Sequence, residues 1–265
     1  MDQAQLDQKI KLDRKIKVDR KKEEGGLWET IKVVVQALLI ALVVRTLLFQ
    51  PFNIPSGSLI PTLLIGDYLF VSKYSYGYSK HSIPFSPPVF SGRLWGSEPK
   101  RGDIAVFKLP KDNSTDYIKR VIGLPGDRIQ VRDGGLQING TPVKRERIQD
   151  YQTQDAFGRT ISVPQYREIL PEGPAYAIIE RDGDRGYWDN TNVYTVPPGH
   201  YFMMGDNRDN STDSRDESSV GFVPFENFVG RAEIIFFSID ESASAWQVWQ
   251  WPWTVRWSRI FNPIR

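Results

Sequence analysis

The sequence has 265 residues, 40% of them hydrophobic, a composition typical of a folded protein and not of a disordered scaffold. Its formal net charge of +2 gives no reason to expect a polyanionic partner, so we expect no nucleic acid among its partners. The chain has no cysteine, which excludes disulfides and thiolate chemistry, and it has only two histidines, His81 and His200. Because the two histidines are far apart, we also expect no catalytic metal.

The first 26 residues are rich in charge and contain a tandem repeat, KIKLDR at 9–14 and KIKVDR at 15–20. Charge runs are usually solvated, so we predict a basic tail over residues 1–26. The interleaved isoleucine, leucine and valine side chains would also permit contact with a membrane surface or a partner.

An apolar run, IKVVVQALLIALVVRTLLF, follows at residues 31–49. A helix of this length reaches about the 30 Å thickness of a bilayer core. No small-x-small cleavage site follows Phe49, which argues against a cleavable signal peptide. We therefore predict a transmembrane anchor over residues 27–49.

The distribution of basic residues predicts the orientation of this anchor. Lysine and arginine crowd its N-terminal flank, whereas residues 50–72 contain none. This asymmetry argues against a buried core helix, and the positive-inside rule places the tail in the cytoplasm and the rest of the chain outside it. We expect a single-pass protein of the plasma membrane or of a thylakoid-type internal membrane.

From Tyr68 onward, short alternating runs bounded by glycine, proline or aspartate predict β-strands. The predicted strands are 68–72, 104–108, 117–122, 128–131, 136–138, 201–204 and 232–239. The fold class is therefore mostly β, with one N-terminal transmembrane helix followed by an extracytoplasmic β-domain over residues 50–240. Residues 141–198 are predicted to form an inserted subdomain, and residues 74–101 a long loop.

Two turn motifs refine this prediction. LPGD at 124–127 places proline and glycine where a type II turn prefers them, and DGG at 133–135 suits a tight hairpin. We therefore expect two successive hairpins between Tyr117 and Asn139.

Five of the eight tryptophans lie within twelve residues near the C-terminus: Trp246, Trp249, Trp251, Trp253 and Trp257. Indole rings favour the headgroup level of a bilayer. We predict a Trp-rich membrane-interface tail over residues 241–265, with Arg256, Arg259 and Arg265 facing lipid phosphates. Packing of these rings on the domain's own sheet is the alternative.

The segment NIPSGSLIPTLLIGD, residues 53–67, sets two hydroxyls and a glycine between Pro55 and Pro61. Both prolines restrict the backbone, so Ser58 is expected on a rigid turn, as a nucleophile requires. The alternative is a polar loop that merely ends the preceding helix.

A serine nucleophile needs a base, and a lysine can serve if burial lowers its pKa. In DYIKRVIG at 116–123, Lys119 and Arg120 lie on opposite faces of the predicted strand, so one cation must face inward. The pattern does not decide between them, and it leaves Lys73 and Lys108 as further candidates.

A third segment, GDNRDNSTDSR at 205–215, is dense in short polar side chains, with three acids and two arginines. Mutual hydrogen bonds and ion pairs predict an ordered loop. A calcium loop through Asp209, Ser211 and Asp213 is one alternative, although Ser214 stands where such a loop needs glycine. A solvated loop is the other.

Together, these segments resemble the type I signal peptidases: PSGSLIPTLLIGDYLFVSKYSYG, RGDIAVFKLP with YIKRVIGLPGD, and GDNRDNSTDSR are similar to that family's serine, lysine and acidic boxes. The resemblance implies Ser58 as nucleophile, Lys119 as general base, and Ser56 with the Ser58 amide as oxyanion hole. It further implies that Ser211 orients Lys119 while Asp213 and Arg215 pair to support the site. The implied substrate-binding residues are Ile54, Pro55, Leu59, Leu63, Tyr117 and Ile118.

The function implied by this resemblance is a membrane-anchored serine endopeptidase that cleaves signal peptides from exported preproteins after small residues, in the A-x-A pattern. It needs no cofactor and no metal, and its partners are preproteins and membrane lipid. Two alternatives remain: a self-cleaving repressor-type Ser-Lys peptidase, and a non-enzymatic tethered β-domain that binds partners through its tryptophan tail.

Overall fold

The computed structural model describes residues 28–154, 157–240, 243 and 246–264. The predicted basic tail at 1–26 and Arg265 lie outside the described residues. The chain divides into two compact units, residues 1–45 and residues 46–265.

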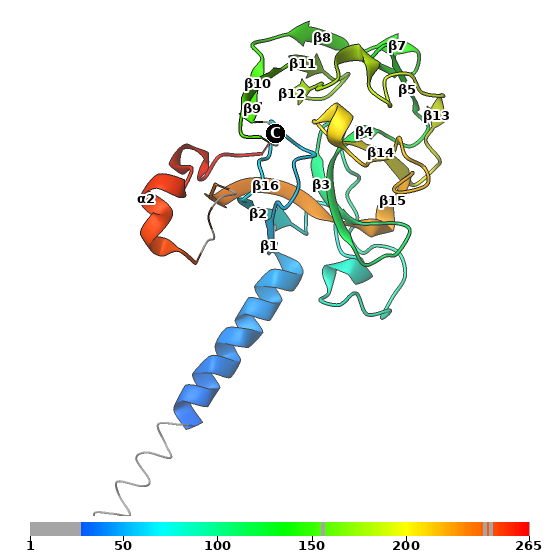
Figure 1. Ribbon diagram of the computed structural model, residues 1–265. Coiled ribbons are helices and arrows are strands. Elements are labelled where there is room, and N and C mark those ends of the chain that lie inside the picture. Colours follow the sequence, from blue (N-terminus) through cyan, green and yellow to red (C-terminus); the bar gives the residue numbers. More distant parts are fainter. Residues whose placement is uncertain (1–27, 155–156, 241–242, 244–245, 265) are drawn as a thin grey trace, which may run out of the picture. The chain divides into compact units, whose positions relative to one another are not determined.

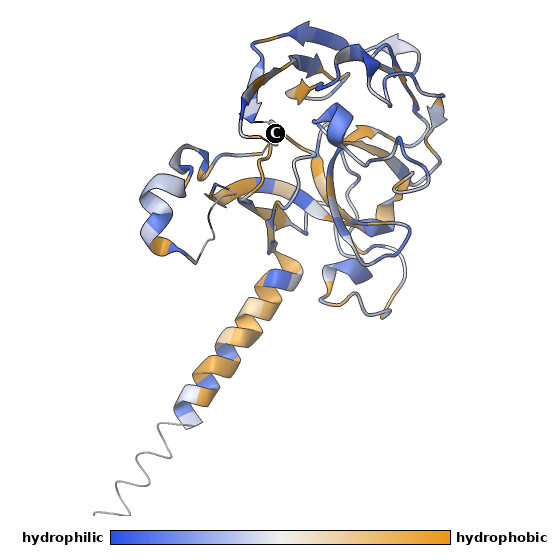
Figure 2. Ribbon diagram, viewed as in Figure 1, coloured by the Kyte–Doolittle hydropathy of each residue, from blue (hydrophilic) through white to orange (hydrophobic). Residues whose placement is uncertain are grey.

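The N-terminal helix, Trp28–Leu47, is the one described helix that is long and apolar enough to cross a membrane. Figure 2 shows hydrophobic residues along most of its length. The helix ends two residues before the predicted end of the apolar run, because Phe49 belongs to a strand and pairs with Ser72. The ring of Phe49 lies 6.2 Å from that of Phe70 on the partner strand.

The second unit is built mainly from strands, so the predicted mostly β fold is confirmed (Figure 1). The strands are β1 (Phe49–Asn53), β2 (Asp67–Ser72), β3 (Ile104–Lys108), β4 (Asp116–Gly123), β5 (Arg128–Arg132), β6 (Gly135–Ile138), β7 (Thr141–Pro142), β8 (Lys144–Arg147), β9 (Tyr151–Gln154), β10 (Thr160–Val163), β11 (Gln165–Ile169), β12 (Ala175–Ile179), β13 (Tyr194–Thr195), β14 (His200–Met204), β15 (Val223–Pro224) and β16 (Phe228–Ser238). The helical segments are η1 (Lys80–Ser82), η2 (Gly183–Arg185), η3 (Arg208–Asn210), η4 (Phe225–Asn227), η5 (Val248–Gln250), α2 (Trp251–Thr254) and η6 (Trp257–Arg259).

The largest sheet has seven strands in the order β1-β2-β16-β3-β4-β14-β15. Its strands pair antiparallel, and β3 shows how both faces are covered. Ile104 and Val106 belong to one core cluster, whereas Ala105 and Phe107 belong to another. Because successive side chains of a strand point to opposite faces, apolar layers lie on both sides of this sheet.

The seven predicted strands are all present, but only one of the two predicted hairpins is correct. Strands β5 and β6 form the expected hairpin, with Asp133 and Gly134 at φ of 49° and 70°. The turn at 124–127 also forms, with the Asp127 amide donating to the Leu124 carbonyl at 3.0 Å. However, β4 pairs with β3 and β14, whereas β5 pairs with β6 and β13. This turn therefore carries the chain from one sheet to another.

The residues between β6 and β14 form further small sheets. Strands β12, β11 and β8 make a three-stranded sheet, and β9 pairs with β10. Figure 1 shows β8, β11 and β12 gathered at one end of the domain. Strand β12 is tied to the loop after β14, because the Ile179 amide donates to the Asp206 carbonyl at 3.0 Å.

The C-terminal segment folds back on the large sheet and also exposes apolar rings. Arg256 donates to the Ile65 carbonyl, and Arg259 forms an ion pair with Asp67 at 2.6 Å. The prediction that Arg256 and Arg259 face lipid is therefore wrong, because both bind protein groups. Trp251 packs on Phe237, but four tryptophans stay 60% to 87% exposed: Trp246, Trp249, Trp253 and Trp257.

Candidate active site

Ser58 lies in the turn that follows β1, and its side chain is buried against β4. The Ile54 amide donates to the Asp67 carbonyl at 2.8 Å, which fixes the start of this turn beside β2. The residue Ser58 is 7% exposed, and its Oγ accepts a hydrogen bond from Lys119 Nζ at 2.6 Å. The structure thus brings together a hydroxyl and an amine that are sixty-one positions apart.

Lys119 comes from the middle of β4, opposite Ala105 of β3. It is 4% exposed, and its neighbour Arg120 is 0% exposed. We expected only one of these two cations to face the protein interior. This expectation is wrong, because both faces of the sheet are covered and both cations are buried.

Burial sets the protonation of Lys119. Removal from water lowers its pKa to about 8, against the opposing influence of the Asp213 and Asp206 carboxylates. The Arg215 guanidinium acts in the same direction as burial. A substantial neutral fraction of this amine is therefore present at mildly alkaline pH.

The other two candidate lysines lie elsewhere and do not contact Ser58. Lys73 Nζ donates to the Ser82 carbonyl at 2.5 Å. Lys108 Nζ donates to the Ser114 carbonyl and forms an ion pair with Asp116 at 2.9 Å.

The loop at 205–215 is ordered by buried ion pairs, as its composition predicts. Arg215 contacts both carboxylate oxygens of Asp213 at 2.9 Å. Burial raises the pKa of Asp213, but the Arg215 guanidinium and the hydrogen bonds to the carboxylate together more than offset this, so the pKa is lowered overall. This pairing places Asp213 with an arginine, which argues against the calcium loop through Asp209, Ser211 and Asp213.

Two further arginines are paired around the same loop. Arg120 binds Asp206 through two hydrogen bonds of 2.8 and 2.7 Å. Arg208 binds both oxygens of Glu168 on β11. These pairs connect the loop to β4 and to the sheet of β8, β11 and β12, so they fix its position next to Ser58.

Ser211 does not make the predicted hydrogen bond to Lys119. Its Oγ is buried and has no hydrogen-bond partner among the described residues. Lys119 instead donates to Ser58, and Ser211 Oγ lies over Gly205, where an added Cβ would come within 2.2 Å of it. The same added Cβ would lie 2.5 Å from the Ser58 carbonyl oxygen. Only glycine at position 205 therefore lets the loop pass this close to Ser58.

The backbone on both sides of Ser58 is held by Asn207. The Asn207 amide donates to the Ser58 carbonyl at 3.1 Å, and its Nδ2 donates to the Gly57 carbonyl at 3.0 Å. The Ser58 amide makes no hydrogen bond to any described residue. The Ser56 hydroxyl is exposed on the same short segment.

A hollow of about 350 Å³ opens beside Ser58 and Lys119. Of the predicted substrate-binding residues, Pro55, Tyr117 and Ile118 line it. Ile54, Leu59 and Leu63 lie beneath the turn in the hydrophobic core, with exposures of 3% or less. Their apolar character serves packing under the turn, and that demand cannot be distinguished from pocket lining in the sequence.

Four residues that line this hollow were not among the predicted site residues: Gly57, Asp116, Asn210 and Thr212. Asn210 and Thr212 are the sequence neighbours of Ser211 in the 205–215 motif, and this position is the one sequence feature that could have indicated them as lining residues. Asp116 begins the strand that carries Lys119.

A serine hydrogen-bonded to a buried lysine beside an open hollow fits a serine hydrolase, and the apolar helix before this β-domain is long enough to anchor it in a membrane. Residues 27–237 match the family model described as signal peptidase, peptidase S26. The chain is 46% identical to signal peptidase I of Rickettsia typhi (strain ATCC VR-144 / Wilmington) over 212 residues, 76% of either protein. It is 45% identical to signal peptidase I of Rickettsia conorii (strain ATCC VR-613 / Malish 7), again over 76% of each.

A crystal structure of a signal peptidase I from Enterococcus faecalis V583 is 28% identical and covers 51% of this chain and 97% of that one, with a TM-score of 0.30. The family match and the rickettsial relatives establish that the chain belongs to the signal peptidases of family S26, serine endopeptidases that remove signal peptides from preproteins.

Proposed function

We propose that Ser58 is the nucleophile and Lys119 the general base of signal peptide cleavage. The observation that carries this proposal is the 2.6 Å contact between Lys119 Nζ and Ser58 Oγ inside the protein. As pH rises through about 8, Lys119 loses its proton and becomes able to accept one. Ser58 then attacks the scissile carbonyl while its own proton passes to Lys119.

The same lysine completes the reaction. The protonated Lys119 donates to the departing amine of the mature protein, which leaves an ester between Ser58 and the signal peptide. A water molecule, activated by the again neutral amine, hydrolyses this ester and restores the serine hydroxyl. No metal and no cofactor is needed for either step.

The oxyanion of each tetrahedral intermediate is assigned to two donors, the Ser58 amide and the Ser56 hydroxyl. The free amide of Ser58 supports the first assignment, and the position of Ser56 at the hollow supports the second. Donors at such a site typically contribute about 10²- to 10³-fold to the rate. Asp213 and Arg215 hold the loop beside Lys119, and Ser211 is assigned a positioning role within it.

The substrate is assigned to the hollow as an extended strand between residues 54–58 and β4. Strand addition supplies backbone hydrogen bonds, and the hollow supplies selectivity. Its walls at Pro55, Tyr117 and Ile118 leave room for small side chains, which fits cleavage after residues in the A-x-A pattern. Family membership favours preproteins over self-cleavage and over a purely binding role.

The chain is assigned a single-pass orientation with a cytoplasmic N-terminus and an extracytoplasmic β-domain, in a plasma or thylakoid-type membrane. The basic residues before the helix support this orientation. The exposed rings of Trp246, Trp249, Trp253 and Trp257 fit the headgroup level of the bilayer, which makes the 241–265 segment an interface tail with lipid as its partner. No nucleic acid is assigned as a partner.

Cleavage of a preprotein in detergent micelles tests the assignment of the pair. We expect Ser58→Ala and Lys119→Ala each to lose at least about 10⁴-fold in kcat, because the two groups act as one unit. Ser219→Ala, in an outer turn, is the matched control and should cleave like the unaltered protein. Substantial cleavage by either site variant, with folding intact, would refute the proposed roles.

A further inference from the structure

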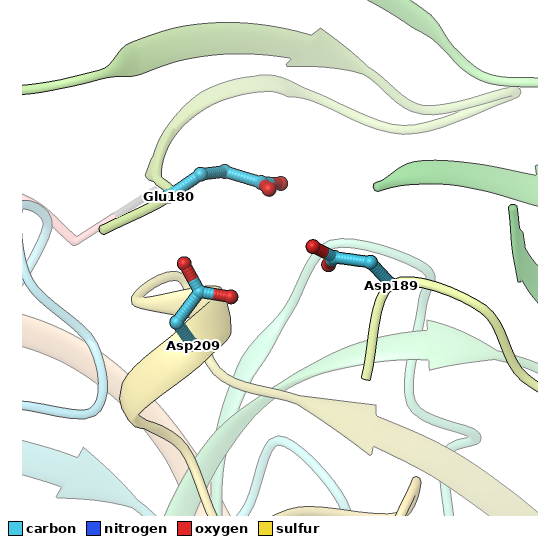
Figure 3. Close-up of side chains that lie close together, drawn as sticks. All are labelled: Glu180, Asp189 and Asp209. Atoms are coloured by element: carbon cyan, nitrogen blue, oxygen red, sulfur yellow. The ribbon is translucent and has the colours of Figure 1, made fainter. Parts of the chain in front are cut away.

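Three acidic side chains converge at a place that the proposed reaction does not use. Glu180 follows β12, Asp189 lies after η2, and Asp209 belongs to η3. One oxygen from each lies within 4.8 Å of the others. Figure 3 shows the three carboxylates pointing toward one another from separate parts of the chain.

Two oxygens of this cluster are buried without a hydrogen-bond donor. Glu180 is 0% exposed, and although its Oε1 lies 3.3 Å from Arg145 Nη1, its Oε2 has no partner among the described residues. Asp209 Oδ2 accepts from the Asp182 amide at 2.7 Å, but its buried Oδ1 has no partner either. An ionised carboxylate oxygen can only accept, so two buried oxygens without a donor, on side chains that converge, indicate a proton or a cation between these side chains.

The nearby guanidinium groups are shared with, or bound to, carboxylates outside this cluster. Arg145 also pairs with Asp184 at 2.9 Å, and Arg208 and Arg215 are bound to Glu168 and Asp213. Burial raises the pKa of all three carboxyl groups, to about 8 for Glu180, although nearby arginines act in the opposite direction.

The donor set defines the kind of cation. It consists of carboxylate oxygens without nitrogen or sulfur, which suits hard divalent ions better than zinc or copper. One oxygen of each carboxylate lies within 4.8 Å of the others, so a single ion with Ca²⁺–O bonds of about 2.4 Å can reach all three. Mg²⁺ usually keeps several of its waters and is seldom held by protein ligands alone.

We propose that Glu180, Asp189 and Asp209 bind one divalent cation of the Ca²⁺ type. The ion ties the segment after β12 to the loop at 205–215, next to the existing bond between the Ile179 amide and the Asp206 carbonyl. Asn210, directly after Asp209, lines the substrate hollow, so the ion supports one wall of the groove without touching the reacting atoms. The site differs from the calcium loop considered from the sequence and shares only Asp209 with it.

Terbium luminescence tests this proposal on the full chain in detergent micelles. Trp188 precedes Asp189 and lies close enough to sensitise Tb³⁺ bound there. We expect one saturable Tb³⁺ site that Ca²⁺ displaces more effectively than Mg²⁺. Saturating Ca²⁺ should also raise Tm by about 5 °C over the protein in EDTA.

Two variants make the result specific. Glu180→Gln keeps the side-chain shape but removes one ligand charge, and it should weaken Tb³⁺ and Ca²⁺ binding at least about tenfold. Asp209→Asn should weaken binding in the same way, and it serves as the test variant if Glu180→Gln folds poorly. Glu146→Gln is the matched control, because the Glu146 side chain pairs with Lys144 on β8. This variant should bind Tb³⁺ and Ca²⁺ as the unaltered protein does.

Ser58→Ala should bind the cation normally, so failure of this proposal is distinguishable from failure of the proposed function. Absence of saturable binding, or equal binding by Glu180→Gln and the unaltered protein, would overturn the site. The carboxyl groups would then be satisfied by a shared proton.

Discussion

Lys119 and Arg120 are neighbours on β4 and equally hidden from water, but their surroundings differ in one respect. Arg120 is matched by the Asp206 carboxylate through two hydrogen bonds, and Arg208 and Arg215 are matched in the same way. No carboxylate among the described residues forms an ion pair with Lys119, which faces the neutral Ser58 hydroxyl. The ion pairs give each buried arginine a counter-charge and a structural role. Lys119 has no such pair, and burial lowers its pKa.

The largest expected effect comes from giving position 119 a side chain that cannot lose its proton. Lys119→Arg keeps the charge but has a pKa beyond the working range of any peptidase. We expect kcat for preprotein cleavage to fall by at least about 10⁴-fold, with no recovery at alkaline pH. Lys144→Arg, an exposed change on β8, controls for the substitution itself. Alkaline rescue of Lys119→Arg would contradict the base role.

The second prediction removes the counter-charge of a buried arginine. Asp206→Asn leaves the Arg120 guanidinium buried without its counter-charge, and removing one partner of a buried pair costs about 3–5 kcal/mol. The free energy of unfolding should fall by that amount in chemical denaturation, with the slope unchanged. Asp150→Asn, which breaks an exposed pair with Arg147, should cost less than about 1 kcal/mol. Equal losses of unfolding free energy in the two variants would show that the buried pair contributes no more to stability than the exposed one.

The smallest effect is a shift of the pH profile. For the unaltered protein, kcat/KM should rise with pH and level off above about 8, as Lys119 loses its proton. Asp213 raises the pKa of Lys119, and Arg215 lowers it. Asp213→Asn removes the first influence and leaves the second, so the midpoint should move to lower pH by roughly half to one unit.

Measurement of kcat/KM between about pH 6 and 10 checks this sign. Asp216→Asn lies in the same stretch of chain, where its carboxylate binds Ser218 and Ser219, and should leave the midpoint unchanged. A midpoint that stays in place or moves to higher pH in Asp213→Asn would show that Asp213 does not set the protonation of Lys119.

Local patterns in the sequence were enough to predict seven of the sixteen described strands and the segments that meet at the site. Alternation identified β3 and β4, and the paired acids and arginines of 205–215 predicted an ordered loop. The resemblance to signal peptidases singled out Ser58 and Lys119, and the structure places them in contact.

What could not be predicted depends on pairing across long distances. The turn at 124–127 was identified, but its geometry is local and does not tell which sheet the next strand joins. Alternation could not choose between Lys119 and Arg120, because it carries no information on a second layer covering the sheet. Glu180, Asp189 and Asp209 come together only through the fold, and no spacing in the sequence relates them.

The clamp that Asn207 forms on the carbonyl groups of Gly57 and Ser58 has a consequence for the entropy of catalysis. With both carbonyls bonded, the peptide units on either side of Ser58 cannot rotate, and its amide keeps one direction. The loss of freedom that orients this donor therefore occurs once, when the chain folds, and is not repeated in each turnover. In the proposed mechanism, a substrate carbonyl that enters the groove would therefore meet a donor that already points to the place where its negative charge develops.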